Sequence, residues 1–403
     1  MTESVENTAR RATSSSPSLR GEGIVLRGLY FLFYGSGASW YPFFNVYLQQ
    51  VGLSGVQIGT LSAIRPAVMV LTQPLWGVVA DLWGRWRTLF LTMLLAAVSV
   101  LGFAWGAGFW FLLLWTVLQA FLSNPVGPLV DSLVLDYLES ESGLSYGRLR
   151  LWGAVGWALL SYVAGRVITG RDMRLIFVCG AVLMLSGWGL ALCTPRKTGA
   201  TTHTPGSDWR GIGPLLRNRR LVTFLILVAL LYVGASPAFS FFSVYMNELG
   251  ASRQMIGLAL GIQGLSELPV YLVANAVIKR LGLTKTLVVT FVVMSARALL
   301  YSWISEPTLA VMLQLAHGSF SLFLVASVEY VNRTVPSVWR ATGQSLFWAA
   351  HMGLGAILGN LLAGVLYDRV GAQGLFRWSG FIILAVALVA AVALRERPVR
   401  QET

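Results

Sequence analysis

The chain has 403 residues, of which 56% are hydrophobic and only 12% are charged. Water-soluble domains carry about 25% charged residues, so this composition excludes a soluble globular protein. The net charge of +13 would suit a nucleic-acid-binding protein, but the positions of the basic residues indicate another cause, described below.

Apolar runs of roughly 20 residues, the length that crosses about 30 Å of hydrocarbon, recur along the chain. They predict a disordered polar tail at 1–22, a first group of helices at 23–194, a basic linker at 195–218, a second group at 219–394 and a tail at 395–403. In chain order the predicted helices are 24–50, 57–80, 88–107, 109–138, 148–170, 173–194, 219–248, 254–278, 285–304, 307–334, 341–367 and 373–394. The fold class is an all-α membrane protein with twelve transmembrane helices.

Lysine and arginine are unevenly distributed over the loops. About 22 of the 30 lie in the termini and in the loops after even-numbered helices, about six lie in the other loops, and two lie inside helices. Because basic loops stay in the cytoplasm, we expect both termini there, in a multi-pass protein of the inner (plasma) membrane. The basic excess is thus a topology signal, and no nucleic-acid partner is expected.

An internal repeat divides the chain into two halves. A shift of 198 residues aligns Phe43–Leu48 with Phe241–Met246, and it also aligns Ile58-Gly59 with Ile256-Gly257. One offset shared by two helices and the loop between them indicates two pseudo-symmetric six-helix bundles. Parallel repeats of this kind hold a site near the bilayer midplane, between halves that rock against each other.

The loop after the second predicted helix carries a spaced motif of glycines and charges. Gly77, Asp81, Gly84, Arg85 and Arg87 form the pattern G-x-x-x-D-x-x-G-R-x-R. This pattern resembles a signature of the major facilitator superfamily. At a helix end a nearby arginine can pair with Asp81, and the cluster would latch one conformation and release it in the other. Ordinary positively charged loop residues are the alternative interpretation.

Few ionisable side chains lie at membrane depth, where each is costly and therefore a functional candidate. They are Arg65, Asp131, Glu267, Arg297, His317 and, as a weaker candidate, His351. Glu267, Arg297 and His317 lie on three consecutive helices of the second half. A low-polarity site favours the neutral form of a carboxyl group, whereas a neighbouring arginine favours the ionised form. We therefore predict that Glu267 carries a coupling proton; a static interhelical pair is the alternative.

The same three positions resemble the acidic, arginine and histidine positions of the lactose permease type of proton symporters and their 3-phenylpropionate and nucleoside relatives. The resemblance implies that the three side chains serve proton coupling. The segment Tyr146–Trp157 also matches that family. By this match Arg150 and Trp157 would bind substrate, and Asp131 resembles the family's substrate-binding acid.

The chain departs from the lactose permease pattern at several charged positions. Phe320 replaces the proton-carrying acid, Gln314 and Met352 replace lysines, and serines at 240 and 243 replace two acids. Acids and bases are lost together, as expected when an unpartnered buried charge is expensive. Gln314 three residues before His317 looks more like the 3-phenylpropionate branch.

Arg65 is an additional positive charge on the second helix. Together with Arg150 and Arg297 it would give a central cavity a positive bias suited to a carboxylate. The alternative is that Arg65 pairs with Asp131, or with carbonyl groups at a helix end, and never meets substrate. A sugar and an aromatic acid therefore both remain as substrate classes.

The leading hypothesis is a proton-coupled symporter that imports a small organic solute and works as a monomer. The proton would be the coupling ion, with no other cofactor and no metal. A proton-linked exporter of lipophilic compounds is the alternative on the same fold; an acid on the first helix would favour it, and Tyr30–Tyr47 contains none. A membrane enzyme or an ATP-driven pump would need metal-ligand spacings or a phosphate-binding loop, and the sequence has neither. A receptor that does not transport remains open.

Overall fold

The computed structural model describes residues 17–138, 145–194 and 212–394. Helices of the first half are α2 (Pro17–Gln50), α3 (Gly55–Trp83), α4 (Arg85–Gly102), α5 (Phe109–Ser123), α6 (Val126–Leu138), α7 (Tyr146–Ile168) and α8 (Leu175–Ala191). Those of the second half are α9 (Ile212–Arg217), α10 (Arg219–Ala235), α11 (Pro237–Ser240), α12 (Phe242–Glu248), α13 (Arg253–Leu281), α14 (Leu283–Tyr301), α15 (Pro307–Leu313), η2 (Gln314–His317), α16 (Gly318–Thr334), η3 (Ser337–Trp339), α17 (Arg340–Trp348), η4 (Ala349–Gly355) and α18 (Ala356–Ala393).

Each of the twelve predicted ranges overlaps helical structure, and several extend beyond the observed helix ends; 88–107, for example, runs past the end of α4 at Gly102. Among the described residues, nine helices are long and apolar enough to cross a membrane. The first helix begins at Pro17, earlier than predicted, so the expected tail at 1–22 is partly helical. Within the predicted linker, 195–211 lies outside the described residues and α9 is helical.

Several spans are interrupted where local chemistry disfavours a continuous helix. Asn124 and Pro125 separate α5 from α6, and Pro237 begins α11. Proline lacks the amide hydrogen that a helix interior needs. Gly371 has a φ of 68° and joins the last two predicted helices within α18. Such a φ is readily adopted by glycine, so the chain turns there without strain.

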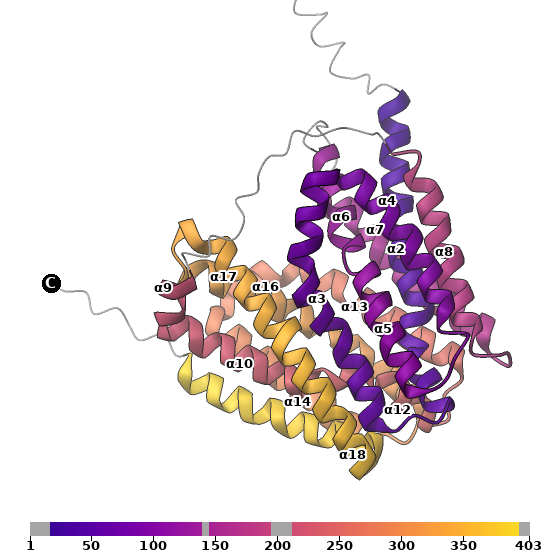
Figure 1. Ribbon diagram of the computed structural model, residues 1–403. Coiled ribbons are helices and arrows are strands. Elements are labelled where there is room, and N and C mark those ends of the chain that lie inside the picture. Colours follow the sequence, from indigo (N-terminus) through magenta and orange to yellow (C-terminus); the bar gives the residue numbers. More distant parts are fainter. Residues whose placement is uncertain (1–16, 139–144, 195–211, 395–403) are drawn as a thin grey trace, which may run out of the picture.

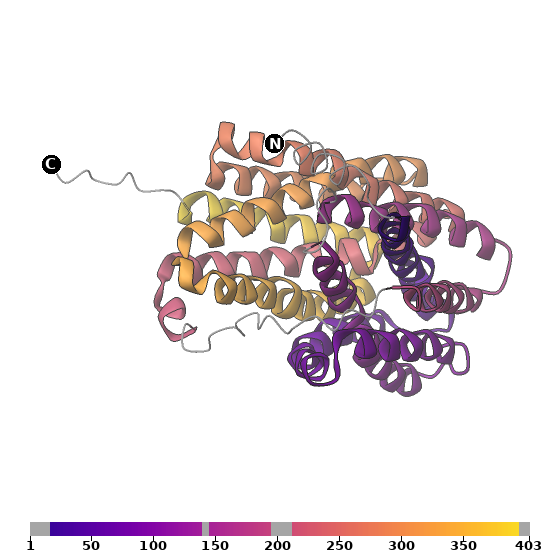
Figure 2. The ribbon, with the colours of Figure 1, turned by 90° about the horizontal axis from the view of Figure 1, so that it is seen from above.

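The helices form two bundles that meet at one end only. In Figure 1 the first half (indigo to magenta) runs upright and the second half (rose through orange to yellow) runs across the page, and the two come together near α12 and the kinked part of α18. Figure 2, turned by 90°, shows the helices of the first half nearly end-on beside the lengthwise helices of the second. One hydrophobic cluster spans both halves and includes Phe44 and Phe241, whereas two others each stay within one half.

Two pairs of helices make the contact between the halves, α3 with α18 and α7 with α13. A methyl group added at Gly59 would overlap the carbonyl oxygen of Asn360, and one added at Gly257 would overlap that of Ser161. Gly59 and Gly257 are equivalent in the 198-residue repeat, so the closed contact is itself pseudo-symmetric. Glycine at both positions lets the helix backbones touch.

Charged side chains cap helix ends across this closed contact. Asp368 of α18 accepts hydrogen bonds from the backbone amides of Gly55 and Val56 at 2.5 and 2.8 Å, at the start of α3. Arg253 at the start of α13 donates to the carbonyl oxygens of Ile168 and Arg171, both at 2.6 Å, at the end of α7. An anion at a helix N-terminus and a cation at a C-terminus are both favourable.

At the opposite end the halves diverge. Beyond the closed contact, Leu71 and Leu82 of α3 are 73% and 85% exposed, and Leu272 of α13 is 86% exposed. Helix α9, which follows the linker, lies toward the same end in Figure 1. The interior between the bundles therefore opens toward the end that carries the linker.

Candidate substrate and proton-coupling site

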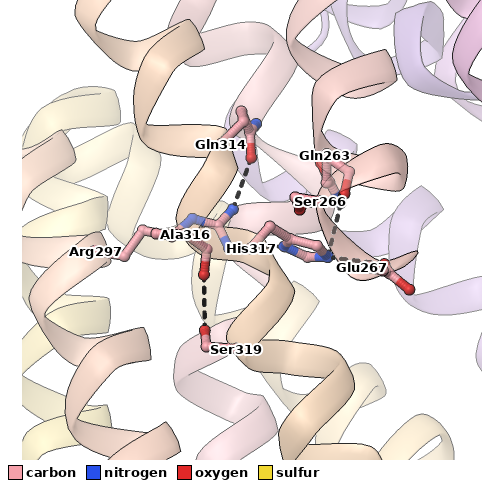
Figure 3. Close-up of polar contacts among 8 residues, drawn as sticks. All are labelled: Gln263, Ser266, Glu267, Arg297, Gln314, Ala316, His317 and Ser319. Atoms are coloured by element: carbon pink, nitrogen blue, oxygen red, sulfur yellow. Dashed lines mark hydrogen bonds and ion pairs between the residues drawn. The ribbon is translucent and has the colours of Figure 1, made fainter. Parts of the chain in front are cut away.

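Glu267, His317 and Arg297 form a chain of polar contacts across three helices of the second half. Glu267 comes from α13, Arg297 from α14, and His317 ends the short 3-10 helix η2. The Oε1 atom of Glu267 lies 3.3 Å from Nε2 of His317, and Nδ1 of His317 lies 2.7 Å from Nη1 of Arg297. Figure 3 shows the imidazole between the carboxylate and the guanidinium. The structure thus brings together all three residues predicted for proton coupling.

The geometry assigns the tautomer of His317. A guanidinium group can only donate hydrogen bonds, so Nδ1 of His317 must accept from Arg297 and carries no hydrogen. The hydrogen of the neutral ring then lies on Nε2 and points at Glu267. A second ring proton would face the guanidinium directly. The hydrogen-bond geometry therefore favours the neutral imidazole of His317.

The 3-10 geometry of η2 places two side chains on one face. Residues three apart eclipse each other in a 3-10 helix, and Gln314 and His317 both contact Arg297. Nη2 of Arg297 donates to Oε1 of Gln314 at 3.0 Å, and Nε donates to the hydroxyl of Tyr301 at 3.2 Å. Each of the three guanidinium nitrogens thus makes one hydrogen bond, although Arg297 is only 6% exposed.

Glu267 differs from its two partners in its access to solvent. Its side chain is 27% exposed, whereas His317 is buried. Gln263, one turn earlier on α13, places Nε2 at 3.2 Å from Nε2 of His317, and its Oε1 has no hydrogen-bond partner in the described part of the chain. Exchanging the two amide atoms would let Oε1 accept from His317, so Gln263 supports the same tautomer.

The first half holds a second polar cluster in which tyrosines contact the charges. The hydroxyl of Tyr30 donates to Oδ1 of Asp131 at 2.7 Å. The guanidinium carbon of Arg150 lies 4.0 Å from the ring centre of Tyr34 and 5.9 Å from that of Tyr30. Neither tyrosine was predicted as a site residue, because tyrosine is common in membrane helices and no sequence feature distinguishes these two.

Trp157 connects the two clusters. Its ring lies near Gly37 of α2 and within 3.2 Å of a methyl group added at Gly264, which is one turn before Glu267 on α13. The ring of Trp157 thus packs against α13 across the space between the halves.

Arg65 lies on the other side of this space and does not pair with Asp131. Its Nη1 donates to Oε1 of Gln119 at 2.7 Å, and its guanidinium carbon lies 4.9 Å from the ring centre of Tyr41 and 5.5 Å from that of Trp40. It lines a cavity of about 270 Å³ between the halves. The alternative of a pair with Asp131 is therefore wrong.

His351 stands apart from the proton-coupling chain. It is buried in the π-helical segment η4, and neither ring nitrogen has a hydrogen-bond partner among the residues described. The ring of Phe320 lies between it and His317, with ring-centre distances of 5.9 and 5.4 Å. The structure does not join the two histidines.

A comparison of the sequence with models of known protein families identifies the family of this chain. A family model described as the MFS_1 like family matches residues 24–378. The chain belongs to this family of the major facilitator superfamily. The protein is therefore a multi-pass membrane transporter of a small-molecule substrate and not an enzyme.

Named relatives and a solved structure agree with this membership. A maltose permease of Geobacillus stearothermophilus is 31% identical over 381 residues, which are 93% of this chain and 95% of that protein. A probable 3-phenylpropionic acid transporter of Escherichia coli is 27% identical over 378 residues, 92% of this chain and 95% of the relative. The crystal structure of the nucleoside transporter NupG matches with a TM-score of 0.85 at 18% identity, covering 93% of this chain and 99% of that one. The last comparison supports the fold alone.

The transporter's predicted latch motif is only partly assembled. Gly84 ends α3 with a φ of 97°, which explains the glycine. Arg85, expected beside Asp81, pairs instead with Asp136 of α6 at 2.8 Å, because α4 begins at Arg85 and directs it toward that helix. Gly77, Asp81 and Arg87 are exposed at the open end, and Asp81 forms no ion pair within the described ranges.

The transporter carries the first part of the same pattern a second time. Gly364, Asp368 and Gly371 repeat the spacing G-x-x-x-D-x-x-G at the end of the span that packs against α3. Asp368 caps α3 at the closed end. Asp368 was not predicted as a site residue, although the repeated spacing of the motif is the sequence signal that marks it.

Proposed function

We propose that the protein is a proton-coupled symporter that imports a small organic solute, a sugar or an aromatic carboxylate, by alternating access. It would work as a monomer in the inner (plasma) membrane with both termini in the cytoplasm. The proton would be its coupling ion, and no other cofactor is proposed. The names of the relatives, a maltose permease and a probable 3-phenylpropionic acid transporter, support both solute classes.

One observation carries the proposal, namely the polar chain from Glu267 through His317 to Arg297. His317 accepts from Arg297 and faces Glu267 with its other ring nitrogen, so a second proton on the imidazole would face the guanidinium directly. Glu267, the partly exposed end of this chain, is then the group that would gain and lose the coupling proton.

The open end then has a place in the transport cycle. With cytoplasmic termini, the conformation described above faces inward, and the partial exposure of Glu267 gives its proton a way out. In the outward-facing form Glu267 would be protonated and solute would bind near Arg150, Asp131 and Trp157. The protein would change between its outward-facing and inward-facing forms only with solute and proton both bound or with neither bound. This restriction couples solute movement to proton movement through a shift in population.

The test is to measure the lumenal pH of proteoliposomes that contain the purified protein and a trapped pH dye, with no gradient imposed. Addition of a transported solute outside should acidify the lumen because symport brings protons inward. Protein-free liposomes control for solutes that cross as neutral acids, and an uncoupler should abolish the signal. Solutes to test are maltose, a nucleoside and 3-phenylpropionate.

The sign of the pH change separates the alternatives. Lumenal alkalinisation would mean exchange of solute for protons and would support the proton-linked exporter. Solute uptake without any pH change would contradict coupling, and the absence of uptake for every solute would contradict the proposal as a whole.

A further inference from the structure

We propose that the cavity beside Arg65 binds the carboxylate group of an organic acid, so that the transported solute is an organic anion with an apolar body. This inference rests on the proposed function and names its substrate class. The cavity lies between the halves, two turns beyond the closed contact at Gly59, on the side opposite Glu267. Its wall includes Tyr41, Arg65, Asn124, Phe239, Met352 and Asn360.

Arg65 is a half-buried cation without an anionic partner. Gln119 accepts a hydrogen bond from its guanidinium and two aromatic rings pack on it, but none of these groups carries a negative charge. Of the three ion pairs found within the described residues, none includes Arg65. A charge at membrane depth is costly unless it is neutralised, and a ligand carboxylate would neutralise it by a charge-assisted, two-pronged hydrogen bond.

The walls supply the other features of a ligand site. One buried donor of a lining residue, Nδ2 of Asn124, has no hydrogen-bond partner in the part of the chain that the structure describes. Tyr41, Phe239 and Met352 provide apolar surface. A volume of about 270 Å³ is close to the lower limit of small-molecule pockets, about 300 Å³. A few polar groups in an apolar wall would orient one acidic group and accommodate an apolar body.

The internal repeat relates this cavity to the proton site. The 198-residue offset that equates Gly59 with Gly257 places Arg65 opposite Gln263 and Met69 opposite Glu267. Gln263 contacts His317 beside the coupling carboxyl, and Met69 lines the Arg65 cavity. Arg65 and Glu267 thus lie one helical turn apart in the register of the repeat, and each corresponds to an uncharged residue in the other half.

The charges of the site explain why an anion and a proton would move together. With His317 neutral, three arginines at 65, 150 and 297 face two carboxylates at 131 and 267, which leaves one net positive charge. Protonation of Glu267 adds one positive charge, and a bound monocarboxylate removes it again. The fully loaded and empty forms then carry the same charge, whereas the half-loaded forms carry a different one. Changes in buried charge are expensive, so the half-loaded forms are the ones that would not cross.

Binding to carboxylates and to their amides of equal size tests the assignment. Three pairs suffice: 3-phenylpropionate, benzoate and hexanoate, each with its primary amide, measured by calorimetry on the detergent-solubilised full chain, with maltose as a neutral sugar. At least one carboxylate should bind tenfold or more tightly than its amide. If no pair reaches that ratio, or if maltose binds more tightly than every carboxylate, the assignment is overturned.

Matched variants locate the preference. Arg65→Gln should abolish the carboxylate preference, and Arg65→Lys should keep part of it. Arg377→Gln removes an exposed arginine from α18 and should change nothing. Met352→Glu keeps Arg65 but places an internal carboxylate in the cavity wall, and it should also abolish the preference. Retention of the full preference in folded Arg65→Gln or Met352→Glu, judged by thermal unfolding, would overturn the site.

Failure of this inference can be distinguished from failure of the proposed function. Lumenal acidification by maltose with no preference for any carboxylate would reject the anion site and leave proton symport standing. Tight carboxylate binding that depends on Arg65 but never moves protons would support the site and reject symport. As a further check, accumulation of the carboxylate driven by a pH gradient should be unchanged by an inside-negative potential, because one anion and one proton carry no net charge. A tenfold increase with potential would overturn the charge balance on which the assignment rests.

Discussion

The two polar clusters use similar residue types in opposite ways. In the first half, Asp131 accepts a hydrogen bond from Tyr30 and Arg150 packs on Tyr34. In the second half, Glu267 reaches Arg297 through an imidazole whose tautomer is fixed. An aromatic ring holds a charged group in place without responding to it, whereas a hydrogen-bonded chain that ends in a partly exposed carboxyl can respond to a proton.

The difference suggests a division of labour between the halves. The tyrosine-held charges of the first half suit solute binding, where a fixed geometry is an advantage. The chain of the second half suits coupling, where one group must change its charge. Variants of the two clusters should therefore have different defects. An assay of solute exchange without net transport distinguishes them, because exchange needs solute binding but not proton release.

The largest effect is expected for Arg150→Gln. Loss of a charged, hydrogen-bonding group from a binding site costs about 2 kcal/mol or more, so solute exchange should fall at least thirtyfold, and net uptake with it. Arg148→Gln, an exposed arginine two residues earlier on α7, is the matched control and should retain exchange. Isotope counterflow in proteoliposomes measures both. Normal exchange in Arg150→Gln would contradict the assignment of solute binding to the first half.

The next effect is expected for His317→Phe. It removes the acceptor of Nη1 of Arg297 and the donor to Glu267 at once, and one buried donor left unsatisfied costs about 1–3 kcal/mol. Net uptake driven by a pH gradient should fall about tenfold, and exchange should fall less. His351→Phe is the control, because its ring nitrogens make no hydrogen bond to any described residue. Equal losses in the two variants would contradict a specific role for His317.

A smaller effect is expected at the closed end, which determines from which side both clusters are reached. Asp368→Asn removes an ionised cap from the start of α3, worth about 1 kcal/mol, so the inward-facing population should decrease about fivefold relative to the outward-facing one. Spin labels at positions 82 and 338, both exposed at the open end, report the change as a shorter distance. An unchanged distance distribution would show that Asp368 does not hold this end closed.

The smallest effect is expected for Tyr30→Phe. The lost hydrogen bond only positions Asp131, which keeps its charge, and at the low end of the net value of a hydrogen bond, about 0.5 kcal/mol, the apparent solute affinity should fall about twofold while coupling to protons persists. The ratio of accumulation with and without a pH gradient measures coupling at saturating solute. A loss of coupling in this variant would mean that Asp131 also responds to protons.

Much of the fold could be predicted from the sequence because membrane spans and repeats leave strong patterns. Apolar runs marked the helices, and the 198-residue offset marked the equivalence of Gly59 and Gly257, which the structure shows at the closed contact. Helix interruptions were less predictable. The 3-10 segment η2 has no proline or glycine within it, and it depends on tertiary contacts of Gln314 and His317 with Arg297.

The site could be predicted in part. Rare charges at membrane depth are informative because burial is costly, so Glu267, Arg297 and His317 stood out and lie together. Partners that are common residue types were not predictable, as Tyr30 and Tyr34 show. The partner of Arg85 was also missed, because sequence proximity favoured Asp81 whereas the turn at Gly84 directs Arg85 to Asp136.

The most direct test of the central claim compares exchange with accumulation in Glu267→Gln. Glutamine keeps the size and the hydrogen bonding of the carboxyl group but cannot carry a proton, so counterflow exchange should persist while accumulation driven by a pH gradient disappears. Glu329→Gln is the control, because Glu329 forms an exposed pair with Arg333. Accumulation by Glu267→Gln at the level of the unmodified protein would show that the proton is carried elsewhere and would contradict the account.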